Sequence, residues 1–541
     1  MLKVTGAGPR ARLAIVAGLF LVALVTGAWL LDRGSRSGAT SISPFQAARL
    51  FDQVMQHASG DFVDSIPDSV LYRKAVTGML YELHDPQSAY IPGDRFARVR
   101  GLSRVDSAPL GIAVEVREKS IVVIAAAPGS PSARAGIQPG DELARINGQA
   151  TDGWTVEEAR DALRGPPGSS VSLLIARPGG PDSIAIALTR DTRRQSTVRD
   201  AAVIGDVGYL QLASLDDSTA AELEGAVTSL LVKGARSLIL DLRDNAAGAA
   251  TYAVKVSDLF LGPKQRVVTI NARDRKLSRV FDDSSAEKWP ALVLAILVNG
   301  RTAGGAEIIT GALQDHDRTL VVGHQTYGKG SEQSDLTLGA FGGLELTTAR
   351  WYTPSGRAVG KPQSDEDEDD PQNVLLRLKK FRTDAGRGVF GTGGLVPDVL
   401  IGDTTTTYQE AALADQLGGK VAILNDELAK YAAEMKSRNA IKSPDFAVTP
   451  AMRDDLWRRI TARGVKIDRF AFDQAEPYLS RLIGDQIART VFGPDAALRR
   501  RSLSDRALGK AIQLARGVRN ERALLRRGAL DSQSADSVRA R

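Results

Sequence analysis

The chain has 541 residues, a formal net charge of +6 and no cysteine. Several domains are expected at this length, because a single hydrophobic core stops growing at about 250–300 residues. The lack of cysteine excludes disulfides and thiol nucleophiles, and the small net charge gives no reason to expect nucleic acid as a partner. Four histidines without metal-ligand spacing indicate neither a metal site nor a cofactor.

The N-terminal segment is predicted to be a membrane anchor. Lys3, Arg10 and Arg12 precede an uncharged run over residues 13–31, which is close to the roughly 20 apolar residues that span a bilayer. No small-residue cleavage site follows, so we expect an uncleaved single-pass inner-membrane helix with the body in the periplasm or another extracytoplasmic space. A cleaved signal peptide is the alternative. Residues 1–43 are thus assigned to a cytoplasmic stub, the anchor and a flexible tether.

Residues 44–104 are predicted to form an N-terminal helical region. Phe45, Leu50, Phe51, Val54 and Met55 recur at spacings of three and four residues, which is the period of an amphipathic helix. Nothing in this region indicates chemistry.

Residues 105–192 show short apolar strands separated by Gly/Pro turns. The run Ala135-Gly136-Ile137-Gln138-Pro139-Gly140-Asp141, followed by Ile146-Asn147-Gly148, resembles a PDZ domain. The resemblance implies that a polypeptide C-terminus adds a strand beside Ile112 to Val114, while backbone N–H groups at Gly111 bind its carboxylate. The implied peptide-binding residues are Leu110, Gly111, Ile112, Ala113 and Val114. A PDZ-shaped module without a ligand stays open as the alternative.

Residues 193–404 are predicted to form an α/β core, because strands and helices alternate at α/β spacing. The apolar run 292–298 ends at Asn299-Gly300, small residues around Gly304 open a helix, and a second strand leads to Gly328-Lys329-Gly330. Such a βαβ unit has a crevice at its strand ends, where α/β proteins tend to place their chemistry.

Residues 405–541 are helical in pattern and increasingly basic. Phe470, Phe472, Tyr478, Leu479 and Leu482 supply an apolar face, and the region from Arg499 to Arg527 supplies the charge. A packed helical cap with a solvated basic side is expected. A basic amphipathic helix that binds anionic lipid or a protein partner is the alternative.

Several ordered motifs together resemble the carboxyl-terminal processing (tail-specific) peptidase family. They are Leu240-Asp241-Leu242-Arg243, Gly311-Ala312-Leu313-Gln314-Asp315, Gly328-Lys329-Gly330 and Tyr352-Thr353-Pro354-Ser355-Gly356-Arg357. The resemblance implies a multidomain α/β fold with a ClpP/crotonase-like core, an inserted PDZ domain and a helical C-terminal region. It also implies a serine-type endopeptidase with a lysine general base.

The resemblance assigns Lys329 as the base and Gln333 as the residue that holds its amine. The family's Ser-Ala-Ser-Ala-Ser-Glu segment aligns on Thr302 to Glu307, which puts Gly304, without a hydroxyl, at the nucleophile position. The oxyanion region is assigned to Ala247, Gly248 and Gly305. A second departure lies here, because the family's Asn-Pro-Gly-Gly reads Asn245-Ala246-Ala247-Gly248.

The predicted function is therefore binding of polypeptide C-termini or unfolded exported proteins through the PDZ domain, with proteolysis impaired or lost. The protein would then serve as a scaffold, an adaptor or the partner of a protease. The alternative is an active serine-type endopeptidase that uses a displaced hydroxyl, Thr302 or Ser331. Arg243, Asp315 and Arg350 are expected to form structural ion pairs.

Overall fold

The computed structural model describes residues 43–85, 87–93, 96, 110–117, 119–126, 130–177, 183–190, 196–246, 248–361, 380–391, 393–402 and 408–539. The chain divides into two compact units, residues 1–78 and 79–541, and each is described by itself. The domain boundaries expected at residues 104, 192 and 404 stay predictions.

The prediction of a single-pass inner-membrane protein is corrected here. In the part of the chain that the structure describes, no helix is long and apolar enough to cross a bilayer. The longest described helix, α19 (Glu521–Arg539), carries arginines and aspartates along its length. The run 13–31, on which the prediction depended, lies outside the described residues, as does the acidic stretch 364–370.

The N-terminal unit begins with helix α2 (Pro44–Gly60), which starts at a capping box. The Ser43 hydroxyl accepts a hydrogen bond from the Gln46 backbone N–H, and the Gln46 side chain accepts one from the Ser43 backbone N–H. These two bonds satisfy backbone donors that a helix start leaves unpaired. The second helix of the region is α3 (Asp68–Tyr81).

The core of the second unit is a six-stranded sheet in the order β19-β14-β13-β10-β9-β8. Neighbouring strands run parallel except β8, which is antiparallel to β9. Every residue of β13 is buried, as expected for a parallel sheet that is covered on both faces. The strands are β8 (Val198–Ile204), β9 (Val207–Leu212), β10 (Ser237–Asp241), β13 (Val293–Val298), β14 (Leu320–Gly323) and β19 (Val399–Leu400).

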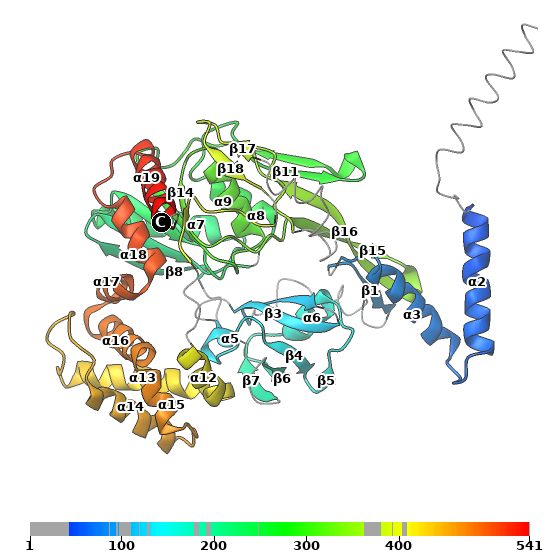
Figure 1. The fold of residues 1–541 in the computed structure, drawn as a ribbon, viewed down its shortest axis with the longest axis horizontal. Helices are drawn as coiled ribbons and strands as arrows, with labels where there is room; N and C mark the ends of the chain where they lie inside the picture. Colours follow the sequence, from blue (N-terminus) through cyan, green and yellow to red (C-terminus); the bar gives the residue numbers. More distant parts are fainter. Residues whose placement is uncertain are drawn as a thin grey trace, which may run out of the picture. The chain divides into compact units, whose positions relative to one another are not determined.

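Helices cover both faces of this sheet (Figure 1). One face packs against α7 (Thr219–Val232), α8 (Ala250–Ser257) and α9 (Gly305–Asp315), which share an apolar core with the strands. The other face packs against α17 (Pro494–Ser504), α18 (Arg506–Ala515) and α19, through residues such as Leu508, Ile512 and Leu524. The apolar side of the basic C-terminal segment is therefore used in the core.

A second sheet has the order β1-β16-β11-β12, with β15 also paired to β16. Its strands are β1 (Ala89–Pro92), β11 (Arg266–Ala272), β12 (Arg279–Asp282), β15 (Ser331–Thr337) and β16 (Gly342–Tyr352). A two-stranded sheet joins β17 (Lys380–Arg382) to β18 (Gly388–Phe390). The second sheet helps to position Lys329, because β15 begins two residues after it.

A third, antiparallel sheet lies between residues 112 and 189, in the order β2-β3-β4-β6-β7 with β5 beside β4. Its elements are β2 (Ile112–Arg117), β3 (Ser120–Ala126), α5 (Pro131–Arg134), β4 (Glu142–Ile146), β5 (Gln149–Ala150), α6 (Val156–Leu163), β6 (Ser170–Ala176) and β7 (Ile184–Thr189). Among the described strands, β2 pairs with β3 alone and contacts α6. One side of β2 is therefore open to strand addition.

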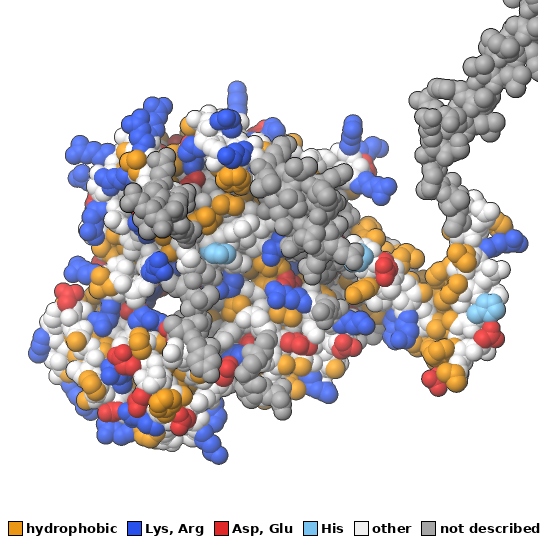
Figure 2. Space-filling view, in the orientation of Figure 1, with side chains coloured by type: hydrophobic (Ala, Val, Ile, Leu, Met, Phe, Trp, Pro, Cys, Tyr) orange, Lys and Arg blue, Asp and Glu red, His pale blue; other side chains and the backbone are white. Residues whose placement is uncertain are grey.

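A helical bundle with its own apolar core precedes α17. It comprises α12 (Tyr408–Leu417), α13 (Val421–Ser437), α14 (Pro450–Ala462), α15 (Arg469–Gln474) and α16 (Glu476–Phe492). Phe472 and Leu479 are buried there, whereas Phe470 is 71% exposed. Exposed arginines after residue 515 lie on the outer side of the C-terminal helices, and Figure 2 shows lysine and arginine side chains gathered there. The packed-cap interpretation fits these observations.

Candidate active site and peptide groove

Lys329 lies in a tightly held loop between β14 and β15. Its neighbours Gly328 and Gly330 have φ values of 82° and 53°. A Cβ at Gly328 would lie 2.6 Å from the backbone carbon of Gly393, and a Cβ at Gly330 would lie 2.1 Å from the Gly360 nitrogen. Only glycine fits both positions, because each needs a positive φ and close backbone approach. The two glycines therefore fix the path of the chain on either side of the lysine.

Gly304 is the N-cap residue of α9 and has φ 65° and ψ −125°. This is a sharp strand-to-helix turn of the strained kind that exposes a nucleophile in some hydrolases. A Cβ at Gly304 would lie 3.9 Å from Lys329 Cδ, 3.8 Å from the Ala246 carbonyl oxygen and 3.9 Å from the Gly248 carbonyl oxygen. The structure thus brings Gly304, Lys329 and Gly248 together, and it leaves ordinary van der Waals room for a side chain at position 304.

Glu307 joins the start of α9 to the lysine loop. Its carboxylate is fully buried and accepts four hydrogen bonds. The donors are the backbone N–H groups of Gly304 (3.1 Å), Gly328 (2.7 Å) and Lys329 (3.0 Å), and the Thr326 hydroxyl (2.6 Å). Burial raises the pKa of the Glu307 carboxyl, and these four hydrogen bonds act in the opposite direction. Glu307 therefore holds together the turn at Gly304 and the loop at Lys329, which form the two sides of the crevice.

The turn after β10 is held from two sides. The Asn245 amide donates to the Leu212 carbonyl oxygen (2.8 Å), and the Asn245 carbonyl accepts from the Ala303 backbone N–H (2.9 Å). Gly248 has φ 117°, and a Cβ there would lie 2.4 Å from Leu215 Cβ. Ala247 lies outside the described residues, so its assignment to the oxyanion region stays a prediction.

Gly305 lies at the first position of α9, where helix N–H groups have no intrahelical partner. A Cβ there would lie 2.7 Å from Leu215 Cδ1 and 3.2 Å from the Gly248 carbonyl oxygen. Any larger residue at position 305 would be crowded by these two groups, so glycine is needed there. The helix start places a partial positive charge next to Gly304, which suits a developing anion.

The two alternative hydroxyls have different surroundings. Thr302 is buried, and its hydroxyl donates to the Leu242 carbonyl oxygen (2.9 Å) while accepting from the Asn299 backbone N–H (3.1 Å). A hydroxyl that already donates its proton to a backbone carbonyl is poorly placed to be a nucleophile. The half-buried Ser331 hydroxyl accepts a hydrogen bond from Gln333 Nε2 (3.1 Å) and keeps its own proton for another acceptor.

Gln333 also donates to the Thr347 hydroxyl (3.2 Å). Its predicted role as the residue that holds the Lys329 amine stays a prediction. Of the three expected ion-pair residues, Arg243 pairs with Asp241 and Asp505, and Asp315 pairs with the fully buried Arg357. Arg350 is a strand residue of β16, opposite Asn271 and Ser331.

The five residues expected to bind a peptide lie at the start of β2. Gly111 has φ 76°, and its carbonyl accepts a hydrogen bond from the Ser132 hydroxyl (3.1 Å). The Leu110 carbonyl accepts from the Ser132 backbone N–H (3.2 Å), so Ser132 fixes both carbonyls of this turn. Ile112, Ala113 and Val114 follow in β2, and α6 packs beside that strand. Ile112 and Val116 of β2 and Ala162 of α6 are half-buried and pack against the apolar core of this domain.

Sequence reasoning quoted Glu307 within a motif but gave it no role. The signal was present, because a glutamate three residues after an N-cap is the second half of a capping box. Glycine at the N-cap hid that signal, since it has no side chain to complete the box. Thr326 was also missed, and no local spacing links it to Glu307.

Comparison with known proteins agrees with this architecture. The model of peptidase family S41 matches residues 206–369, and a PDZ domain model matches residues 122–177. A carboxy-terminal-processing protease of Bartonella bacilliformis is 33% identical over 349 residues, which cover 64% of this chain and 79% of that protein. The carboxy-terminal processing protease CtpA of Bacillus subtilis is 29% identical over 328 residues, covering 61% and 69% of the two chains.

A solved structure of a photosystem II D1 C-terminal processing protease is 25% identical, with a TM-score of 0.47, and the match covers 69% of this chain and 90% of that one. The predicted fold class, a mixed α/β protein with a PDZ domain and a helical C-terminal region, is confirmed. Both relatives are named as proteases that process carboxyl termini. With a PDZ domain at residues 122–177 and this degree of identity over most of a relative's length, the chain belongs to peptidase family S41.

Proposed function

We propose that this protein binds the C-termini of polypeptides through its PDZ domain, and that its peptidase site is impaired because residue 304 is glycine. The first part is supported by the edge strand β2, which has α6 beside it, and by half-buried apolar residues on both elements. Addition of a peptide strand to such an edge supplies affinity through backbone hydrogen bonds, and the adjacent pocket selects a side chain.

The second part depends on a single observation. Gly304 lies at a sharp turn with positive φ, within reach of the Lys329 side chain and the Gly248 turn. The resemblance to the family puts the attacking oxygen at this position. Glycine has no side-chain hydroxyl to deprotonate, and loss of the serine nucleophile costs about 10⁶-fold in a serine protease with a histidine base. Binding without cutting suits a scaffold, an adaptor or a regulator of another protease.

A proteolysis assay tests the second part. The purified protein is incubated with an unfolded protein that ends in apolar residues, in parallel with Lys329→Ala. We expect no cleavage beyond the background that Lys329→Ala also shows. Cleavage that disappears in Lys329→Ala would defeat the proposal.

A peptide titration tests the first part. A fluorescent peptide with an apolar C-terminal residue is expected to bind at micromolar concentration, whereas its C-terminally amidated copy binds at least about tenfold more weakly because it lacks the carboxylate. Equal binding of the two peptides would contradict capture of a free C-terminus.

One observation favours a second candidate, an active endopeptidase that uses Ser331. Its hydroxyl lies two residues after Lys329 and keeps its proton available. If lysine-dependent cleavage is found, Ser331→Ala decides between the candidates: loss of cleavage would assign Ser331 as the nucleophile, and retention would exclude it.

A further inference from the structure

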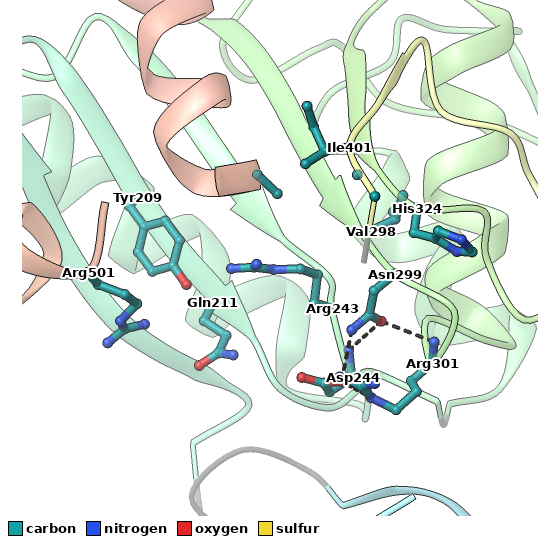
Figure 3. A pocket seen from close by; sticks show the side chains of 13 residues that line it. Tyr209, Gln211, Arg243, Asp244, Val298, Asn299, Arg301, His324, Ile401 and Arg501 are labelled. Carbon is teal, nitrogen blue, oxygen red and sulfur yellow. Dashed lines mark hydrogen bonds and ion pairs between the residues drawn. The ribbon is translucent and has the colours of Figure 1, made fainter. Parts of the chain in front are cut away.

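A cavity of about 230 Å³ lies at the carboxyl ends of the parallel strands, beside α18 (Figure 3). Its lining comes from the ends of β9, β10, β13 and β14 and from α17 and α18. Ligands of open α/β sheets commonly bind outside the carboxyl ends of the strands. The lining differs from that of the crevice around Gly304 and includes Arg243, Arg301 and Arg501.

These arginines have more N–H groups than the nearby carboxylates accept. Asp241 accepts from Nε and Nη2 of Arg243, and Asp505 pairs with the same Nη2. Of the three nitrogens of the Arg301 guanidinium group, only Nε donates to Asp244. Among the described residues, no acceptor takes Nη1 of Arg243 or either terminal nitrogen of Arg301. A guanidinium group has five N–H donors, so several donors line the cavity.

Three further side chains line the cavity. Arg501 donates Nη2 to Asp200 (3.2 Å), and within the described chain its Nε and Nη1 have no acceptor. The half-buried amide of Gln211 lines the same cavity, and no described group hydrogen-bonds to it. His324 contributes a ring whose Nδ1 contacts the Gln325 carbonyl oxygen. The cavity therefore offers many donors to a ligand rich in acceptors.

We propose that this cavity binds a small tetrahedral oxyanion of the phosphate type. Such an anion presents acceptors in four directions, and guanidinium groups pair with it in forked geometry. The nearby carboxylates of Asp200, Asp241 and Asp244 repel the anion less than unpaired carboxylates would, because each is paired with an arginine. The inference is independent of the function proposed above.

The anion would lie beside a hydrogen-bond network that joins the turn after β10 to the segment before α9. The Asn299 side chain accepts from the backbone N–H groups of Asp244 (3.2 Å) and Arg301 (3.1 Å) and donates to the Asp244 carboxylate (3.0 Å), as Figure 3 shows. The turn leads to Gly248 and the segment leads to Gly304. Arg301 is shared between this network and the cavity.

The test is a calorimetric titration of the full chain with inorganic phosphate at pH 7, against sodium chloride at equal ionic strength. We expect saturable binding of phosphate, competition by sulfate, and no saturable binding of chloride. Acetate, which is planar and carries one charge, is expected to bind at least about tenfold more weakly than phosphate.

Variants locate the site. Arg501→Gln and Gln211→Ala are expected to weaken phosphate binding about tenfold and threefold, because they remove a charged and a neutral donor. Arg301→Gln should weaken it further, but it also leaves Asp244 without its arginine. Asp200 keeps its pair with Arg489 when Arg501 is replaced, so the first two variants carry the test. Arg499→Gln is the matched control, an exposed arginine on the same helix α17 that does not line the cavity.

The proposal is overturned by either of two results. The first is a phosphate affinity equal to that of chloride or acetate. The second is an equal loss of affinity in Arg499→Gln and Arg501→Gln, which would indicate general electrostatic attraction rather than this cavity.

Discussion

The peptide groove of the PDZ domain and the crevice at Gly304 both contain glycines with positive φ. The groove depends on backbone groups, whereas the crevice depends on a side chain. In the groove, Gly111 turns the backbone so that β2 can offer its own N–H and C=O groups. In the crevice, the turn at Gly304 presents a position where the side chain itself must react. Recognition by backbone tolerates a change of side chain, whereas covalent catalysis depends on one atom. On the function proposed above, the chain would still bind a polypeptide although it lacks the group that cuts it.

The largest expected effect comes from restoring a hydroxyl to the crevice. We expect Gly304→Ser to raise kcat/KM for an unfolded substrate at least about 10³-fold, because Lys329 and the Gly248 turn already surround that position. Cleavage rates measured with fluorogenic substrate give the comparison. Gly304→Ala is the matched control, because it imposes the same positive φ without an oxygen.

Both substitutions should lower the free energy of unfolding by about 1–3 kcal/mol, since a residue with a Cβ is strained at φ 65° and ψ −125°. No gain of activity in a folded Gly304→Ser protein would mean that the crevice lacks more than the hydroxyl at position 304.

The second prediction concerns whether Glu307 holds the turn at Gly304 and the loop at Lys329 together. Glu307→Gln replaces a carboxylate that accepts four hydrogen bonds with an amide whose NH₂ group faces N–H donors. We expect the free energy of unfolding to fall by about 2–4 kcal/mol, because buried donors lose their acceptor. Chemical denaturation measures it.

Glu332→Gln is the control for that measurement. Glu332 lies on β15 and pairs with the partly exposed Arg279, so its loss should cost under about 1 kcal/mol. Equal effects of the two variants would show that Glu307 is not the link between the loops.

The third prediction tests the groove directly. Ala162→Trp should fill the space between α6 and β2 and weaken binding of a C-terminal peptide about tenfold, as measured by fluorescence polarisation. Ala150→Trp places the same ring on the exposed β5 and should leave the affinity unchanged. A peptide that binds both variants equally would have to occupy another surface.

The smallest effect concerns α8, the helix that follows the Gly248 turn. Burial, together with the charge of Asp283, raises the pKa of the Asp258 carboxyl to about 6. Because the folded pKa lies above the unfolded one, this group's contribution to stability is full below about pH 4 and is lost as the pH rises through 6. Asp258→Asn should therefore raise the free energy of unfolding at pH 8 by about 1 kcal/mol, after allowance for solvent screening.

The same variant should change little at pH 4, where Asp258 is protonated in the folded protein. Thermal denaturation at the two pH values gives the comparison. A gain of equal size at both would show that the aspartate does not titrate as its surroundings indicate.

Much of the fold could be predicted from the sequence, because long periodic segments determine it. The buried run of β13 and the start of α9 near Gly304 lie where the pattern predicts them, whereas the catalytic role of Lys329 stays a prediction. The contacts of Glu307 with Thr326 and of Arg357 with Asp315 could not be predicted, since they join residues far apart in the sequence with no local spacing. The same holds for the cavity at Arg243, which forms only when α17 and α18 pack on the sheet.

The open edge of β2 has a consequence for how the protein behaves at high concentration. An unpaired strand edge can join the same edge of a second molecule, which is a common route to aggregation. A bound peptide occupies that edge and removes the opportunity. Solutions of this protein should therefore scatter less light and tolerate higher concentration when a saturating C-terminal peptide is present.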